Sequence, residues 1–143
     1  MRILVLNGPN LNLLGVREPE IYGKSSYNDL RKLIIDYALE KNHIIHLIQS
    51  NHEGVLIDTL QDGINRYDGI VFNPAAYTHT SIALYDTLLA INIPCVEVHL
   101  SDVENRESFR QTNYIKAACI ASVTNEGIGG YIKAIKILEK RLK

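Results

Sequence analysis

Apolar runs rich in β-branched residues alternate along the chain with segments whose apolar residues recur at the helical period. The runs predict five strands, over residues 2–7, 44–49, 69–73, 95–100 and 118–123. The periodic segments predict one helix that begins at about residue 26 and three more that cover 54–67, 80–92 and 129–142. Residues 106–112 carry a weaker helical pattern. This alternation is typical of α/β proteins.

The first helix has the clearest pattern. Its apolar residues recur at i, i+3, i+4, i+7 and i+8 from Leu30, so the helix must place one apolar stripe against a sheet. Asp29 stands three residues after Ser26, the spacing of a capping box. We therefore expect this helix to begin at Ser26.

Five strands joined by right-handed helical crossovers predict an open, doubly wound parallel sheet. The default is the flavodoxin-like strand order 2-1-3-4-5, in a three-layer fold. A length of 143 residues suits one domain that covers residues 1–143. Such sheets bind ligands beyond the carboxyl ends of their strands. This rule selects the loops at 8–23, 74–79 and 101–105, of which the first is unusually long and too apolar to be disordered.

Composition and charge limit the partners. With 15 basic and 16 acidic residues, the chain lacks the positive field that nucleic acids or anionic membranes attract. No apolar stretch approaches the ~20 residues that cross a bilayer, and the first apolar run is too short for a signal peptide. We expect a cytoplasmic protein. Cys95 and Cys119 lie in apolar, strand-like segments and are expected to be buried hydrophobes rather than a disulfide.

Several familiar chemistries lack their motif. The glycines at 8 and 15 are followed by Val16 rather than Lys and Ser/Thr, so they form no P-loop. Residues 127–130 lack the GxGxxG spacing, and no HExxH or Gly-x-Ser-x-Gly motif is present. The sequence therefore favours acid–base chemistry by side chains, with no metal and no cofactor.

Sequence blocks along nearly the whole chain carry a resemblance. Residues 7–15 and 17–23 read NGPNLNLLG and REPEIYG, followed by QSNHEG at 49–54, NPAAYTHTS at 73–81, EVHLS at 97–101 and RESFR at 106–110. In order and spacing these blocks resemble the type II 3-dehydroquinate dehydratase family. The resemblance implies a metal-free lyase that eliminates water anti from 3-dehydroquinate, through an enolate, to give 3-dehydroshikimate. This is a step of the shikimate pathway of aromatic amino-acid biosynthesis, or of quinate catabolism in reverse. It also implies a dodecamer built as a tetramer of trimers.

The resemblance implies that Tyr22 is the general base, with Arg17 as its helper. An unperturbed tyrosine, with a pKa of about 10, is almost entirely neutral at pH 7, and a guanidinium within about 4–6 Å favours the phenolate. Asn10 would hold the donor or water that stabilises the enolate, and His99 would protonate the departing hydroxyl. Because residues two apart on a strand share a face, we expect Glu97 beside His99, where it keeps the imidazole protonated or oriented.

For substrate binding, the resemblance carries over a set of residues suited to a polyhydroxylated carboxylate. They are Asn73, His79, Ser101 with the Leu100 backbone, and Arg110. Asp86, in the third helix, would reach the site of a neighbouring subunit. His52 and Glu53 also match the family, and we expect them to support the site rather than act on substrate.

The chain departs from the common family pattern in three places. Val16 stands where threonine is frequent, Asp102 where asparagine is usual, and residues 111–113 where a histidine-x-serine stretch is more typical. None of these is a predicted catalytic residue.

Two alternatives without enzymatic activity share the predicted fold. A phosphoacceptor receiver module needs acidic residues after the first strand and an aspartate at the end of the third, where this chain has Asn7, Gly8 and Asn73. A flavin-binding electron carrier would cradle a phosphate with strand-end loops, whereas the first loop offers leucines and asparagines.

Overall fold

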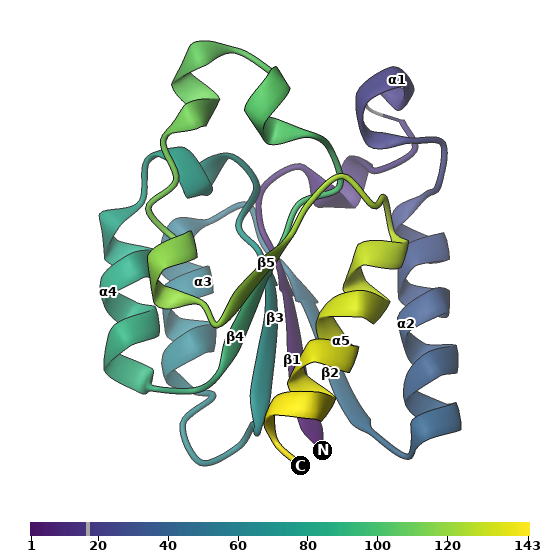
Figure 1. The fold of residues 1–143 in the computed structure, drawn as a ribbon, viewed down its shortest axis with the longest axis vertical. Helices are drawn as coiled ribbons and strands as arrows, with labels where there is room; N and C mark the ends of the chain where they lie inside the picture. The colour runs from purple at the N-terminus through teal and green to yellow at the C-terminus, as the bar shows by residue number, and fades with distance from the viewer. Residues whose placement is uncertain (17) are drawn as a thin grey trace.

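The computed structural model describes residues 1–16 and 18–143, which form one twisted sheet covered by helices (Figure 1). The strands are β1 (Arg2–Asn7), β2 (Ile44–Gln49), β3 (Gly69–Asn73), β4 (Cys95–Val98) and β5 (Ala121–Val123). The helices are α1 (Pro19–Tyr22), α2 (Tyr27–Lys41), α3 (Glu53–Gln61), α4 (Ile82–Ile91) and α5 (Gly129–Arg141). All strand pairs are parallel, in the order β2-β1-β3-β4-β5. The predicted flavodoxin-like fold is confirmed.

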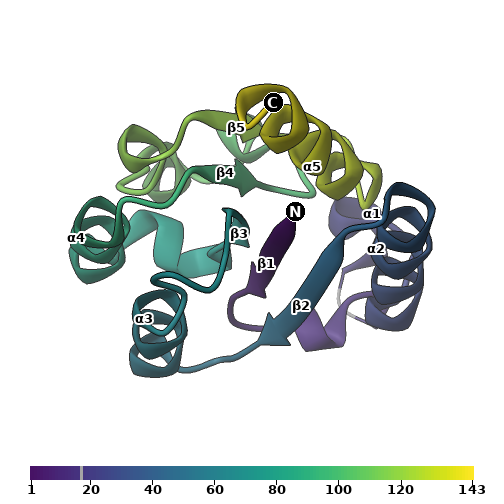
Figure 2. The same ribbon diagram turned by 90° about the horizontal axis from the view of Figure 1, so that it is seen from below.

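The helices cover both faces of the sheet, with α2 and α5 on one side and α3 and α4 on the other (Figure 2). Strand alternation divides β1 between the two cores: Ile3 and Val5 pack with α2 and α5, whereas Leu4 and Leu6 pack with α3 and α4. All four side chains are fully buried, and each contributes about 1.5–3 kcal/mol by leaving water. The central position of β1 therefore follows from its unbroken apolar run.

The capping box predicted for the first helix is present. The Ser26 hydroxyl accepts a hydrogen bond from the Asp29 backbone N–H (3.1 Å), and the Asp29 carboxylate accepts one from the Ser26 N–H (2.8 Å). The two bonds satisfy donors that the helix itself cannot pair.

Several element boundaries differ from the prediction. β4 ends at Val98 rather than at residue 100, because its neighbour β5 ends opposite, at Val123. β5 begins at residue 121, after a 3₁₀ turn over Lys116–Ala118. α3 ends at Gln61, ahead of Gly63 and a left-handed Asn65. The weak helical pattern at 106–112 corresponds to a 3₁₀ turn over Ser108–Gln111.

The carboxyl ends of the strands lie at the top of Figure 1, opposite both chain termini. The loops after β1 and β3 approach closely there, since the Gly8 N–H donates to the Asn73 carbonyl (2.8 Å). A Cβ atom at Gly8 would lie 2.5 Å from the Pro74 carbonyl oxygen, so only glycine fits this contact.

Among the residues that the structure describes, no helix is long and apolar enough to cross a bilayer. Both cysteines are free thiols. Cys95 is buried in β4 as predicted, whereas Cys119 is only half-buried and lies before β5, after the 3₁₀ turn.

Candidate active site

Two asparagines end neighbouring strands, and one of them, Asn73, lines a pocket. Asn7 of β1 lies beside Asn73 of β3 in the sheet, and the Tyr131 hydroxyl of α5 lies between their side chains. This hydroxyl donates to Asn7 Oδ1 (2.6 Å) and accepts from Asn73 Nδ2 (3.0 Å). Burial raises the pKa of Tyr131, so the hydroxyl stays protonated. Asn73 Oδ1 also accepts from the Ala75 N–H (3.1 Å). The protein thus fixes the orientation of the Asn73 amide.

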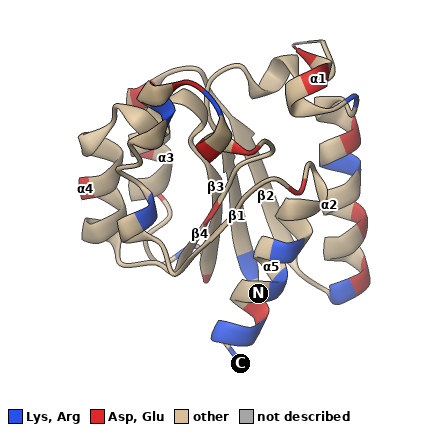
Figure 3. Ribbon diagram, turned by 45° about the horizontal axis from the view of Figure 1, so that its top comes forward, with Lys and Arg blue, Asp and Glu red and all other residues tan. Residues whose placement is uncertain are grey.

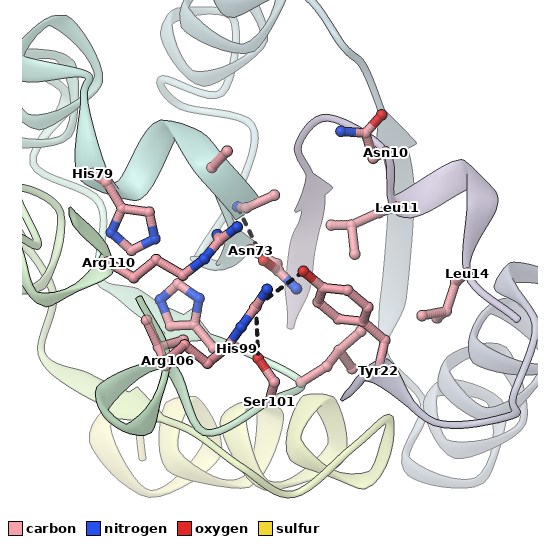
Figure 4. A pocket seen from close by; sticks show the side chains of 14 residues that line it. Asn10, Leu11, Leu14, Tyr22, Asn73, His79, His99, Ser101, Arg106 and Arg110 are labelled. Atoms are coloured by element: carbon pink, nitrogen blue, oxygen red, sulfur yellow. Dashed lines mark hydrogen bonds between the residues drawn. The ribbon is translucent and has the colours of Figure 1, made fainter. Parts of the chain in front are cut away.

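The pocket lies over the carboxyl ends of β1, β3 and β4 (Figure 4). Its walls come from the first loop, the turn after β3, the turn after β4 and residues 103–110. The structure brings together eight of the predicted site residues: Asn10, Tyr22, Asn73, His79, His99, Leu100, Ser101 and Arg110.

Tyr22 presents its hydroxyl to a guanidinium. Arg106 Nη1 donates to the phenolic oxygen (3.0 Å) and lies 3.4 Å from Ser101 Oγ. The guanidinium carbon is 5.1 Å from the centre of the tyrosine ring. The guanidinium therefore lies within hydrogen-bonding distance of both the phenolic oxygen and the Ser101 hydroxyl. Arg17, which was predicted to assist Tyr22, lies outside the described residues.

Arg106 was missed as a site residue by sequence reasoning. The signal was available, because the RESFR block contains Arg106 as well as Arg110, but only Arg110 was given a role. Both arginines line the pocket. Arg110 Nε also donates to Glu107 Oε2 (2.8 Å).

His99 is held by a buried carboxylate. Its Nε2 lies 2.7 Å from Oε1 of Glu97, which confirms the predicted contact along β4. Glu97 is fully buried, and its carboxylate also accepts from Ser122 Oγ (2.8 Å) and Asn113 Nδ2 (2.9 Å). Burial alone would raise the pKa of Glu97, but the bond and charge of His99, with the bonds from Ser122 and Asn113, lower it overall. The carboxylate is therefore ionised, and the hydrogen lies on His99 Nε2.

His79 is held through its other ring nitrogen, Nδ1, whereas His99 is held through Nε2. Its Nδ1 lies 2.7 Å from the Thr112 carbonyl oxygen, so Nδ1 carries the hydrogen. Burial lowers the pKa of His79, and the nearby Arg110 and His99 lower it further, although the bond to Thr112 acts in the other direction. The neutral ring then leaves Nε2 as an acceptor for a ligand hydroxyl.

The first loop is fastened by residues of the QSNHEG block. Asn10 adopts a left-handed φ of 68°, and its backbone N–H donates to Asn51 Oδ1 (3.0 Å). Gln49 Nε2 donates to the same oxygen (3.0 Å) and to the Gly8 carbonyl (3.1 Å). This block therefore supports the first loop without lining the pocket. His52, in the same block, stands at the N-cap position of α3 and makes no side-chain cap hydrogen bond.

Asp86 does not join the others. It is exposed on α4 and lies outside the pocket of its own chain. Within the described ranges, 1–16 and 18–143, no three His, Cys, Asp or Glu side chains are grouped closely enough to hold a metal ion.

Comparison with known proteins places this site in a family. The profile of the family described as dehydroquinase class II matches residues 1–139. The chain belongs to the class II dehydroquinases. It is 48% identical over 142 residues to the 3-dehydroquinate dehydratase of Clostridium acetobutylicum, with 99% of each chain covered. It is also 48% identical over 134 residues to the catabolic 3-dehydroquinase of Talaromyces marneffei, with 94% of this chain and 77% of that one covered.

Solved class II dehydroquinases have the same fold. The crystal structure of the type II dehydroquinase from Butyrivibrio crossotus superposes with a TM-score of 0.96, at 45% identity and 97% coverage of both chains. The Propionibacterium acnes enzyme gives a TM-score of 0.92 at 36% identity. Family membership confirms the resemblance carried by the sequence blocks, and it does not favour the alternatives of a receiver module or a flavin carrier.

Proposed function

We propose that the pocket dehydrates 3-dehydroquinate to 3-dehydroshikimate, with Tyr22 as the base and His99 as the acid. The observation that carries this proposal is that both side chains line one pocket and each contacts a charged group. The Arg106 guanidinium contacts the Tyr22 phenol, and the Glu97 carboxylate contacts the His99 imidazole. The substrate carries a hydroxyl two carbons away from its carbonyl carbon. One residue must therefore remove a proton from the carbon between them, and another must donate a proton to the leaving hydroxyl.

The phenolate of Tyr22 removes the proton from the carbon between the carbonyl and the hydroxyl-bearing carbon. The guanidinium of Arg106, 3.0 Å from the phenolic oxygen, offsets the negative charge that this oxygen must carry. We retain the proposal that Arg17 assists Tyr22, on the strength of the REPEIYG block. The C–H electrons then pass to the carbonyl oxygen and form an enolate. Asn10, on the opposite side of the pocket mouth from the histidines (Figure 4), would stabilise this oxygen directly or through a water.

Collapse of the enolate expels the hydroxyl, which leaves as water when His99 donates a proton to it. Nε2 of His99 is engaged by Glu97, so Nδ1 is the nitrogen that delivers this proton. The Glu97 carboxylate stabilises the imidazolium before the transfer.

Binding of the polar substrate uses the remaining residues of the pocket wall. The Ser101 hydroxyl and the Leu100 backbone, in the turn that follows β4, would hold the carboxylate. Asn73, His79 and Arg110 would contact the ring hydroxyls, and Nε2 of a neutral His79 suits this as an acceptor. The proposal requires no cofactor and no metal, and treats residues 1–143 as a single catalytic domain.

We also propose a dodecamer in which Asp86 reaches the site of a neighbouring subunit. Asp86 is exposed on α4, and the same helix exposes Ile82 (55%) and Leu89 (52%). Large exposed apolar side chains on one helix favour contact with another chain. A cytoplasmic location, with neither nucleic acid nor membrane as partner, completes the proposal. It is supported by the two free cysteines, since free thiols are usual in reducing compartments.

The enone absorbance of 3-dehydroshikimate tests the proposed function. The wild type, treated with a chelator, should form the enone from 3-dehydroquinate, and Tyr22→Phe should not. Absence of enone with the wild type would refute the activity. Loss on chelation alone would refute the metal-free chemistry.

A further inference from the structure

Two consecutive residues behind the pocket hold both of its histidines. The Thr112 carbonyl accepts from His79 Nδ1 (2.7 Å), and the Asn113 amide donates to the Glu97 oxygen that contacts His99. These residues fall where the sequence departs from the common family pattern. Asn113 thus reaches a buried carboxylate 16 positions away in the chain.

The Asn113 amide has a defined orientation. Its Oδ1 accepts from the Ile115 N–H (2.8 Å) and the Lys116 N–H (2.9 Å). The amide nitrogen must therefore point at Glu97, where it can only donate. A donor at this position favours the ionised carboxylate over the protonated acid.

We propose that Asn113 is a positioning residue, which locks the ionised Glu97 carboxylate onto His99 Nε2 and so presents the other ring nitrogen to the pocket. The inference rests on the proposed function, because it assigns how the acid of that reaction is held. Glu97 Oε1 receives both Asn113 and His99, while Oε2 receives Ser122. With three donors around it, the carboxylate has little freedom to rotate away from the imidazole.

The other titratable groups near Glu97 include His99 directly after β4, His79 on the turn after β3, and Cys95 at the start of β4. A hydrogen bond with the Cys119 thiol, together with burial, raises the pKa of Cys95, so the Cys95 thiol is neutral. His79 is neutral for the reasons given above. His99 is the titratable group in direct contact with the Glu97 carboxylate.

The variant Asn113→Asp distinguishes a role of Asn113 in holding the Glu97 carboxylate from a role in supporting the loop. Aspartate keeps an acceptor for the Ile115 and Lys116 N–H groups but replaces the donor facing Glu97 with a second carboxylate oxygen. Two carboxylates in contact raise the pKa of one of them by about 1–3 units. The acidic limb of the kcat profile should move to higher pH by about 1–2 units, and kcat at pH 7 should fall about tenfold. A profile and kcat equal to those of the wild type would overturn the proposal.

Ser122→Ala is the matched control, since it removes a donor from the oxygen that does not contact His99. We expect a smaller shift of the acidic limb than in Asn113→Asp. An equal or larger shift would contradict a special role for Asn113.

Nitrogen NMR of the His99 imidazole, without substrate, provides a readout independent of turnover. The wild type should carry the hydrogen on Nε2, and Asn113→Asp should shift or lose this signal. If the wild type forms no enone, the proposed function is wrong, and the NMR comparison alone tests the role of Asn113. If the enone forms but the His99 signals of the two proteins coincide, the role of Asn113 is refuted and the proposed function stands.

Discussion

Two histidine–glutamate pairs at opposite ends of the molecule have the same contact and different surroundings. His99 and Glu97 meet at 2.7 Å beside the pocket, and His43 and Glu139 meet at 2.7 Å between the end of α2 and α5. Side-chain exposure is 7% and 0% for the first pair, and 10% and 17% for the second. Both glutamates have a lowered pKa, because in each case the histidine and other donors outweigh the effect of burial.

The difference lies in what else faces each pair. The second pair is joined by the Tyr37 hydroxyl, which contacts both Glu139 oxygens, and Lys and Arg residues gather at the nearby end of α5 (Figure 3). The first pair opens onto a pocket that also holds Tyr22 and Arg106. The second pair also lines a hollow, which it shares with Met1, Lys41, Leu142 and Lys143, and it connects the end of α2 to α5. A histidine–glutamate contact therefore indicates catalysis only where the fold adds complementary groups, here at the carboxyl ends of the strands.

Loss of the acid should produce the largest effect. His99→Gln removes the proton donor for the leaving hydroxyl, so kcat should fall about 10²–10⁴-fold. His43→Gln, at the other pair, should leave kcat unchanged. Steady-state enone formation measures both. Equal losses in the two variants would remove the distinction between the pairs.

Loss of the cation at Tyr22 should come next. Arg106→Met should reduce kcat about 100-fold, because it removes the guanidinium that favours the phenolate. Arg66→Met is a close control, since Arg66 also lies over a tyrosine ring, 5.5 Å from the centre of Tyr67. We expect Arg66→Met to be fully active. A fully active Arg106→Met would instead show that the contact with Tyr22 plays no part in the reaction.

The second pair should matter for stability. Glu139→Gln weakens its bonds to His43 and Tyr37 and should reduce the free energy of unfolding by about 1–2 kcal/mol, with kcat preserved. Urea unfolding and the enone assay, run on the same preparation, give the two values. A large loss of activity without a loss of stability would contradict this assignment.

The smallest expected effect is on the pH dependence of stability. The pKa of Glu139 is lowered in the folded state, so its contribution is present above the unfolded value of about 4.3 and is lost as pH falls through the folded value. Below pH 5, the unfolding free energy of Glu139→Gln should therefore fall less steeply than that of the wild type. Parallel curves would mean that Glu139 has the same pKa in both states.

Much of this site was accessible from sequence because local geometry decides it. Strand alternation alone placed Glu97 beside His99, and the order of strands and helices selected the loops that meet at the pocket. The sequence blocks identified Tyr22 but left Arg106 without a role, because the path of residues 103–110 back over the first loop has no periodic signal. The Asn113 contact depends on the same irregular path.

Proton exchange separates the two proposed roles most directly. Incubated with 3-dehydroquinate in D₂O, His99→Gln retains Tyr22 and should exchange the proton between the carbonyl and the hydroxyl-bearing carbon, while forming little enone. Tyr22→Phe should do neither. Exchange in Tyr22→Phe at the rate of His99→Gln, measured by proton NMR, would contradict the assignment of Tyr22 as the base.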